Sequence, residues 1–209
     1  EVWAREYAKA FPGQEKEFAT IARKAILTQV VAAAAERATT ETGAIEGAWT
    51  TLARFDLDGA SSEEKAAFYK NQLILAEKRR RFAEAREAVE NLLRVPGLSG
   101  ADQEYALSRK AWLAELMLDF DGAFTATEKL TKTKRQPIAG ESATWLKLAM
   151  YAELAAKDAK PYYQHFLKET RDGDEAAAVA AQIVRESKEP LKEIEKQRPF
   201  RAKKPEMFA

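Results

Sequence analysis

The sequence repeats itself every 38 residues, and this repeat constrains the fold more than any other feature. Three four-residue blocks, at 74–77, 112–115 and 150–153, each end in Ala-Glu and follow one another at that step. The register extends on both sides of the blocks, since Phe82 matches Phe120 and Ala85 matches Ala123. A fixed period of this length is typical of proteins in which helix pairs stack into a solenoid.

The turns keep the same step and predict where the helices begin. A glycine and then a serine precede the helical stretches that start near residues 62 and 100. Ser61 with Glu64, and Ser99 with Asp102, have the spacing of an N-cap and an acidic partner. We predict an all-α chain with helices over 64–79, 83–94, 102–118 and 121–133, and a right-handed stack that continues through 141–169.

The order of residues within one unit resembles the tetratricopeptide repeat (TPR). A large residue, small residues, an aromatic residue and a terminal proline follow one another as Tyr69, Leu73, Ala76, Phe82, Ala85, Val89, Leu92 and Pro96. The resemblance implies antiparallel helix pairs in close contact at Ala85 and Ala123. The period is longer than the usual repeat of about 34 residues. In addition, the third unit has Pro161 in the place of the contact alanine and Asp158 in the place of the aromatic.

The remaining segments fit one TPR-like solenoid domain over residues 1–189, with core repeats at about 64–169. Residues 15–56 are expected to form a degenerate unit whose first helix runs from Glu15 to Thr39, because Val31, Ala35 and Ala38 precede Tyr69, Leu73 and Ala76 by one period. Residues 174–187 suit a helix that caps the stack. Residues 190–209 are predicted to be a charged, poorly ordered tail.

The composition excludes several classes of protein. A net charge of +1 argues against a nucleic-acid partner. The absence of cysteine excludes disulfides and cysteine-ligated metal sites but is compatible with both cytoplasm and periplasm. No apolar run reaches the length of about 20 residues that spans a bilayer. The chain begins at Glu1 rather than at methionine, so we expect a fragment or a processed form.

No candidate catalytic, cofactor or metal site emerges from the polar residues, and we predict a protein that is not an enzyme. The single histidine, His165, has no triad or metal partner in the pattern. The acidic loops at 56–59, 119–122 and 172–174 lack calcium-loop spacing and are expected to cap helices and form turns. Glu77, Glu115 and Glu153 recur at the period and are predicted to form hydrogen bonds between repeats or to add polarity to a groove.

The resemblance to TPR proteins implies a concave groove lined by the first helix of each unit. Carried over by register, the ligand-facing rows are Ile74, Trp112 and Met150, then Lys70, Ser108 and Leu146, then Asn71, Arg109 and Lys147. An apolar stripe with a basic margin suits a peptide or protein with acidic flanks. Trp112 is the expected hot spot, exposed beside Arg109 and Lys147. The alternative is that the apolar row packs against the neighbouring unit.

Three functions are therefore open from the sequence. The first is a scaffold or adaptor that binds a protein or peptide as one part of a bacterial multiprotein assembly. The second is a helical accessory domain of a larger enzyme or transporter. The third is a helical domain that binds a small molecule, which would need a closed apolar pocket larger than about 300 Å³.

Overall fold

The computed structural model describes residues 6, 9–36, 42–133, 141–170 and 173–208. Over these residues the regular structure is helical, and they contain no β-strand, so the all-α prediction is confirmed. The chain divides into two compact units, the first ending at Leu113 and the second beginning at Ala114. We describe each unit by itself. The prediction of one solenoid domain over residues 1–189 stays a prediction.

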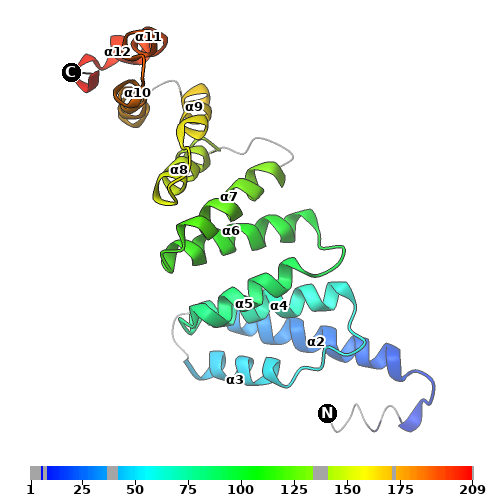
Figure 1. Ribbon diagram of the computed structural model, residues 1–209. Helices are drawn as coiled ribbons and strands as arrows, with labels where there is room; N and C mark the ends of the chain where they lie inside the picture. The colour runs from blue at the N-terminus through cyan, green and yellow to red at the C-terminus, as the bar shows by residue number, and fades with distance from the viewer. Residues whose placement is uncertain (1–5, 7–8, 37–41, 134–140, 171–172, 209) are drawn as a thin grey trace. The chain divides into compact units, whose positions relative to one another are not determined.

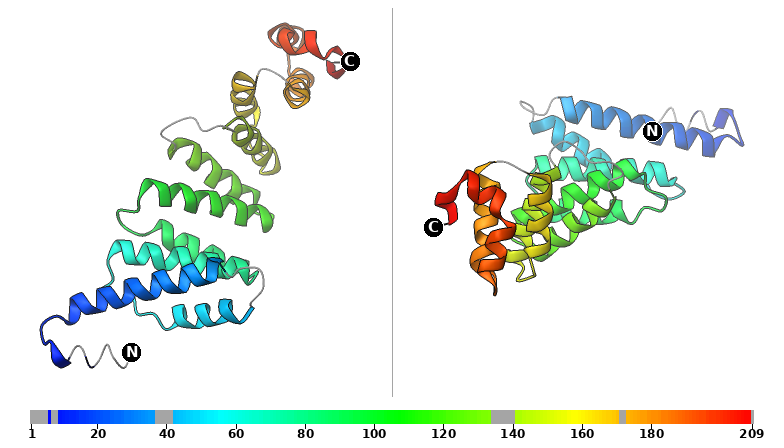
Figure 2. Two further views of the ribbon diagram at one scale, coloured as in Figure 1. Left: turned by 180° about the vertical axis from the view of Figure 1, so that it is seen from behind. Right: turned by 90° about the horizontal axis from the view of Figure 1, so that it is seen from above.

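The described part of the first unit includes helices α2 to α5 and most of α6. These are α2 (Glu15–Glu36), α3 (Thr42–Ala53), α4 (Ser62–Lys78), α5 (Phe82–Leu93) and α6 (Gly100–Leu116), whose last turn belongs to the second unit. Helices α4 and α5 lie side by side, and α2 and α3 pack on each other and on α4 (Figures 1 and 2). Leu73 and Leu92 are fully buried between α4 and α5.

The second unit contains the remaining helices. These are α7 (Phe120–Thr133), α8 (Glu141–Leu154), α9 (Lys160–Glu169), α10 (Asp174–Glu186), α11 (Pro190–Lys196), α12 (Arg198–Lys203) and the 3₁₀ helix η1 (Pro205–Phe208). Its core joins α7, α8, α9 and α10 around Leu148, Phe166 and Ala180. Ala114, in the last turn of α6, belongs to this same core.

The four helices predicted between residues 64 and 133 are confirmed, each within two residues of its expected ends. Ser61 caps α4 as predicted, because its Oγ accepts the Glu64 N–H at 3.2 Å while its own N–H donates to the Glu64 carboxylate. At α6 the Ser99 hydroxyl accepts the Asp102 N–H at 3.1 Å and donates to the Asp102 carboxylate at 2.7 Å. Ala85 and Ala123 are both fully buried, so the small side chains stand where the helices come closest.

The 38-residue step is also present in the backbone. Arg80, Leu118 and Ala156 are the described non-glycine residues with positive φ, at 55°, 58° and 55°, and they follow one another at that step. Each lies just after the first helix of a pair. The residue after each one donates its N–H back into the helix, to the carbonyls of Ala76, Ala114 and Ala152. This is the Schellman ending of a helix, made here without the glycine that usually occupies the left-handed position.

The third helix pair departs from the register for a physical reason. One period after the start of α7 falls on Asp158, but α9 begins at Lys160. The Asp158 carboxylate accepts the Lys160 N–H at 3.0 Å, and Pro161 occupies the first turn, where its missing N–H removes no helical hydrogen bond. Pro161 therefore starts a helix instead of filling a helix crossing.

The segment after Pro190 corrects one expectation. Residues 190–208 are not a poorly ordered tail, because they form α11, α12 and η1 and pack on α10. Phe200 and Phe208 contact the core of the second unit, and Lys204 pairs with Asp174 at 2.8 Å. The apolar anchors are few and widely spaced, and for that reason the charged sequence gives little sign of them. The capping helix predicted at 174–187 is present as α10.

Parts of the degenerate first unit lie outside the described residues. Helix α2 is described up to Glu36, so the expected end at Thr39 and the position of Ala38 cannot be compared. The same holds for the side chains of Val31 and Ala35. The described part does place α2 and α3 beside α4, where Leu27 and Leu52 join a core with Phe68.

Candidate protein-binding face

The predicted binding residues all lie on the first helices of successive pairs. Lys70, Asn71 and Ile74 lie on α4, Arg109 and Trp112 on α6, and Lys147 and Met150 on α8. The predicted residues on α4 and α6 belong to the first unit, and those on α8 belong to the second.

Arg109 binds a carboxylate of the preceding first helix. Its Nε and Nη2 donate to the two carboxylate oxygens of Glu77 at 2.8 and 2.6 Å. The guanidinium also lies over the Trp112 ring, 4.1 Å from the ring centroid. An arginine held by two hydrogen bonds and a ring face has a fixed position. Arg109 therefore serves to join α4 to α6.

Lys147 makes the equivalent contact one period later. Its Nζ lies 2.6 Å from the Glu115 carboxylate, which also accepts the Tyr151 hydroxyl at 2.6 Å. The hydrogen bonds from Lys147 and Tyr151 lower the pKa of Glu115. Burial and the Glu115 bond raise the pKa of the Tyr151 hydroxyl to about 12. The carboxylate stays ionised and the hydroxyl stays protonated across the neutral range.

Glu153 continues the pattern. Its carboxylate accepts a hydrogen bond of 2.9 Å from Gln182 of α10. Each of the three periodic glutamates thus binds a donor on the next first helix or, for the last, on the capping helix. Each of the three glutamates is bonded to another helix, while their role between repeats stays a prediction. We call Glu77, Glu115 and Glu153 the glutamate ladder.

The basic margin expected along the groove needs correction. Arg109 and Lys147 are both paired with glutamates, so their charges are compensated within the protein. Lys70 likewise pairs with Asp102 at 2.8 Å and lies over the Tyr105 ring. The periodic glutamates were visible in the sequence, but their pairing with lysine and arginine 32 residues onward was not recognised. The basis for expecting a partner with acidic flanks is removed.

Asn71 also differs from its expected role. Its side chain is buried, and its amide donates toward the Leu27 carbonyl on α2 at 3.5 Å. It contributes to the packing of α2 against α4 and offers no surface to a partner. The register placed Asn71 in a ligand-facing row because it did not account for α2, which covers that side of α4.

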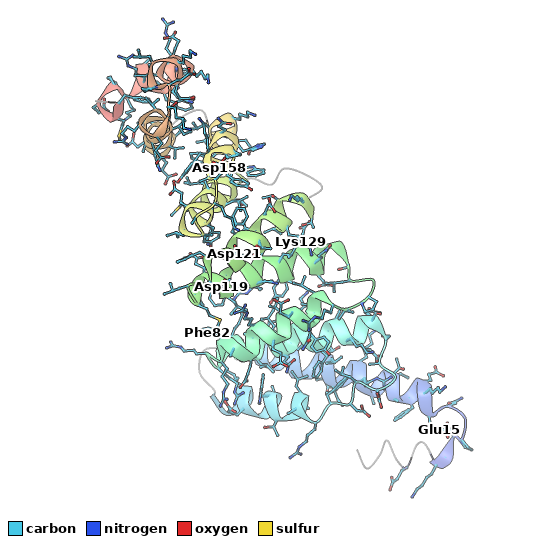
Figure 3. The ribbon with its side chains drawn as sticks, in the orientation of Figure 1. Glu15, Phe82, Asp119, Asp121, Lys129 and Asp158 are labelled. Carbon is cyan, nitrogen blue, oxygen red and sulfur yellow. The ribbon has the colours of Figure 1, made fainter. Side chains whose placement is uncertain are left out.

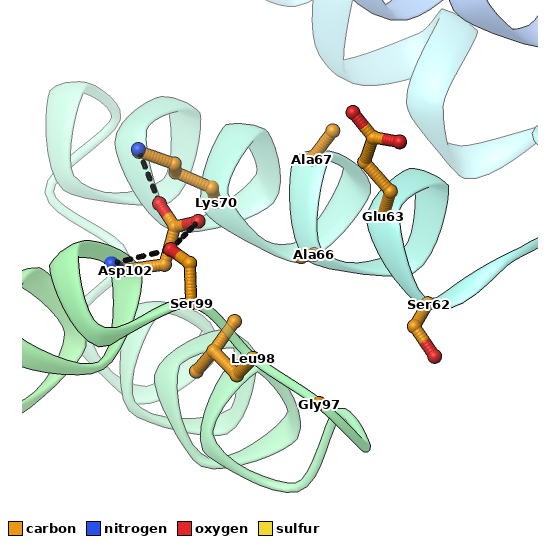
Figure 4. A pocket seen from close by; sticks show the side chains of 9 residues that line it. All are labelled: Ser62, Glu63, Ala66, Ala67, Lys70, Gly97, Leu98, Ser99 and Asp102. Atoms are coloured by element: carbon orange, nitrogen blue, oxygen red, sulfur yellow. Dashed lines mark hydrogen bonds and ion pairs between the residues drawn. The ribbon is translucent and has the colours of Figure 1, made fainter.

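A cleft of about 540 Å³ opens beside Lys70 (Figure 4). Helix α4 and the connection into α6 form its walls, with side chains from Ser62, Glu63, Ala66, Ala67, Lys70, Gly97, Leu98, Ser99 and Asp102. Three of the five lining side chains with polar groups are already bonded, since Lys70 and Ser99 both donate to the Asp102 carboxylate. More of the lining is apolar than polar, but the cleft is partly open to solvent, so it is not the closed pocket expected of a small-molecule domain.

The apolar row is partly accessible. Met150 is 50% exposed. Ile74 is half-buried. Trp112 is also half-buried, with its ring edge-on to Phe82 at 6.2 Å and one face covered by Arg109. The expectation of a substantially exposed Trp112 is therefore met only in part, because the indole contributes to the packing of α6 on α4 and α5.

Comparison of the chain with protein-family models, with curated proteins and with solved structures finds no match.

Sequence reasoning missed a group of exposed apolar residues at the ends of α6 and α8. Leu116, Met117, Leu118 and Leu154 are 47%, 42%, 73% and 57% exposed. Met150 lies one helical turn before Leu154. We call these five residues the turn patch. A signal was available, because Leu116 and Leu154 are one period apart, but the predicted ligand-facing rows did not include these positions.

The other polar candidates have structural roles. The Asp119 carboxylate caps α7 by accepting the Gly122 N–H at 2.9 Å, and Gly59 takes a φ of 66° in its turn. Asp172 lies outside the described residues. His165 is exposed and stacks on Trp145 at 4.5 Å. Within the described ranges no group of three or more histidine, aspartate or glutamate side chains could hold a metal ion, and no described helix could cross a membrane.

Proposed function

We propose that the chain is a non-enzymatic protein-binding scaffold, built of TPR-like helix pairs that stack with a 38-residue period. Its partner is a peptide segment or a protein surface, which docks on the first helices of the pairs. The residues proposed to contact it are Ile74 and Trp112 in the first unit and, separately, Met150 in the second.

One observation carries this proposal. The same helix ending, with left-handed residues at Arg80, Leu118 and Ala156, recurs at the step of the sequence repeat. Repetition of a backbone feature that costs free energy at each position supports a common unit, since non-glycine residues avoid this conformation by about 1 kcal/mol or more. Units of this kind cannot bury their own apolar face, so they stack and present a long surface.

The glutamate ladder supports the same proposal. It joins successive first helices by side chains in fixed positions, as in the two hydrogen bonds between Arg109 and Glu77. A surface that is held rigid before binding loses little conformational entropy when a partner docks. Exposed methionine and leucine beside such a surface are typical of protein-binding sites.

A peptide-display selection tests the proposal. The intact chain is immobilised and offered a random peptide library, and the enriched peptides are then titrated against the chain in solution. We expect binding in the micromolar range. Met150→Ser should weaken it by about tenfold, because Met150 is exposed and its loss leaves the fold intact. Trp112→Ala should weaken it further, together with some loss of stability, because the indole is half-buried.

Leu191→Ser is the matched control. Leu191 is 84% exposed on α11, away from the proposed face, and its replacement should leave binding unchanged. Failure to enrich any peptide over an uncoated surface would contradict the proposed function. Equal effects of Met150→Ser and Leu191→Ser would contradict the proposed face.

A further inference from the structure

The turn patch is held together by contacts on both of its sides. On one side, the Glu115 carboxylate binds Lys147 and Tyr151 of α8. On the other, Lys157 pairs with Asp121 at 2.7 Å and lies over the Phe124 ring. The segment from residue 115 to 121 is thereby fixed alongside the segment from 147 to 157, all within the second unit.

The exposed apolar side chains lie between these two contacts along the chain. Leu116, Met117 and Leu118 fall between Glu115 and Asp121, while Leu154 falls between Tyr151 and Lys157. The patch therefore occupies one rigid part of the surface. Five large apolar side chains that keep 42% to 73% of their surface in water are costly to leave uncovered, at about 25 cal/mol for each Å².

The rim of the patch is acidic. Segments 115–121 and 147–158 carry five carboxylates and two lysines, and both lysines already pair with carboxylates of the same segments. Figure 3 labels three of these carboxylates, Asp119 and Asp121 at the start of α7 and Asp158 ahead of α9. The Asp121 side chain remains 70% exposed despite its bond to Lys157. The two segments therefore carry three more acidic than basic side chains.

The equivalent turn in the first unit has the opposite character. One period before Leu116, Met117, Leu118 and Asp119, the sequence has four basic residues, Lys78, Arg79, Arg80 and Arg81. The framework of the turn, with its left-handed residue, is the same in both places. The apolar and acidic surface at 116–121 is therefore particular to its unit and is not needed to form the turn.

We infer that the turn patch binds a basic amphipathic peptide segment of a partner protein, one with aliphatic or aromatic side chains flanked by lysine or arginine. The apolar side chains cover the patch, and the cationic side chains meet the acidic rim. This inference rests on the proposed function and names the chemistry of the partner. Complementary charge on the rim speeds association and selects among partners, while the apolar contacts hold the complex.

Two fluorescent peptides with opposite charge test the inference on the intact chain. Both have about 14 residues with leucine at helical spacing, and the remaining positions are all lysine in one and all glutamate in the other. Fluorescence anisotropy at about 0.15 M salt should show binding of the lysine peptide that is at least about tenfold tighter than that of the glutamate peptide. Raising the salt concentration should weaken the binding of the lysine peptide more than that of the glutamate peptide.

The double variant Leu118→Asn with Leu154→Gln locates the binding. Asparagine tolerates the left-handed conformation of residue 118, and both changes are on exposed side chains, so the fold is kept. Binding of the lysine peptide should fall by about tenfold or more. Leu191→Gln, which changes the exposed leucine of α11, should bind like the unaltered chain.

Three outcomes would overturn the inference. Equal affinity for both peptides would remove the charge complementarity, and unchanged binding in the double variant would place the site elsewhere. Concentration-dependent dimers in sedimentation velocity, lost in the double variant, would make a second copy of the chain the occupant. A display selection that still yields peptides dependent on Ile74, which is not part of the turn patch, would leave the proposed function standing in each case.

Discussion

The carboxylate of Glu77 is held by Arg109 through two hydrogen bonds of 2.8 and 2.6 Å, and this contact joins two helices whose sequences are one period apart. One period further on, Lys147 holds Glu115 through a single ammonium contact. Arginine fixes both the distance and the plane of its carboxylate, whereas lysine fixes only the distance. The same join is therefore more rigid between α4 and α6 than between α6 and α8.

Breaking the first of these contacts should destabilise the chain. Arg109→Met leaves Glu77, only 14% exposed at its side chain, without its cation and removes the cover of the Trp112 ring. We expect a loss of about 1–3 kcal/mol in the free energy of unfolding, measured by urea titration. Lys192→Met is the control, because the Lys192–Glu189 pair is exposed and should contribute less than about 1 kcal/mol. Equal losses in both variants would contradict a structural role for the ladder.

The second contact predicts a dependence of stability on acid. The hydrogen bonds from Lys147 and Tyr151 lower the folded-state pKa of Glu115 below its ordinary value of 4.5. The stability that ionised Glu115 contributes to the fold is therefore fully present when the pH is above 4.5, and it is lost as the pH falls through the lowered pKa. Glu115→Gln should melt below the unaltered chain at neutral pH and together with it near about pH 2. Glu87→Gln, on the exposed face of α5, should show no such convergence.

The left-handed turns predict that replacing alanine with glycine changes the free energy of unfolding in opposite directions at two positions. Ala156→Gly relieves a φ of 55° and should raise the free energy of unfolding by up to about 1 kcal/mol. Ala178→Gly, at an exposed position inside α10, should lower it by about 1 kcal/mol. Thermal melts of the two variants make the comparison. A loss of stability in both would show that residue 156 is helical in solution.

The buried alanines predict an effect of added volume. Ala85→Leu inserts three carbons where the alanine is fully buried, and this overpacking should cost about 1–3 kcal/mol. Ala83→Leu makes the same change two residues earlier, where the side chain is exposed, and should be nearly neutral. Chemical denaturation distinguishes the pair. Equal stability of the two variants would contradict the helix crossing assigned to Ala85.

Much of the local fold could be predicted because local signals repeat. The capping box at Ser61, the serine cap at Ser99, the buried Ala85 and Ala123, and the helix bounds all follow from spacing within one unit. The helices after Pro190 were missed because Phe200 and Phe208 are isolated apolar anchors in a charged segment, without the periodicity that marks an amphipathic helix.

The candidate site was less predictable because it depends on contacts across the sequence. The sequence predicted that Arg109 and Lys147 form a basic margin, but in the structure they make ion pairs with Glu77 and Glu115. Asn71 was predicted to face a ligand, but its side chain is buried against α2. Register assigns a residue to a face of its own helix, but it does not say which other helix lies against that face.

Hydrogen–deuterium exchange tests the central proposal, docking on the first helices, most directly. A peptide obtained by display selection is added to the intact chain at saturation, and amide exchange is compared with the free chain. The account predicts slower exchange in the second halves of α4, α6 and α8 and in the turns that follow them, with α5, α7 and α9 unchanged. Slower exchange confined to α5, α7 and α9, or no change in any helix with peptide bound, would contradict it.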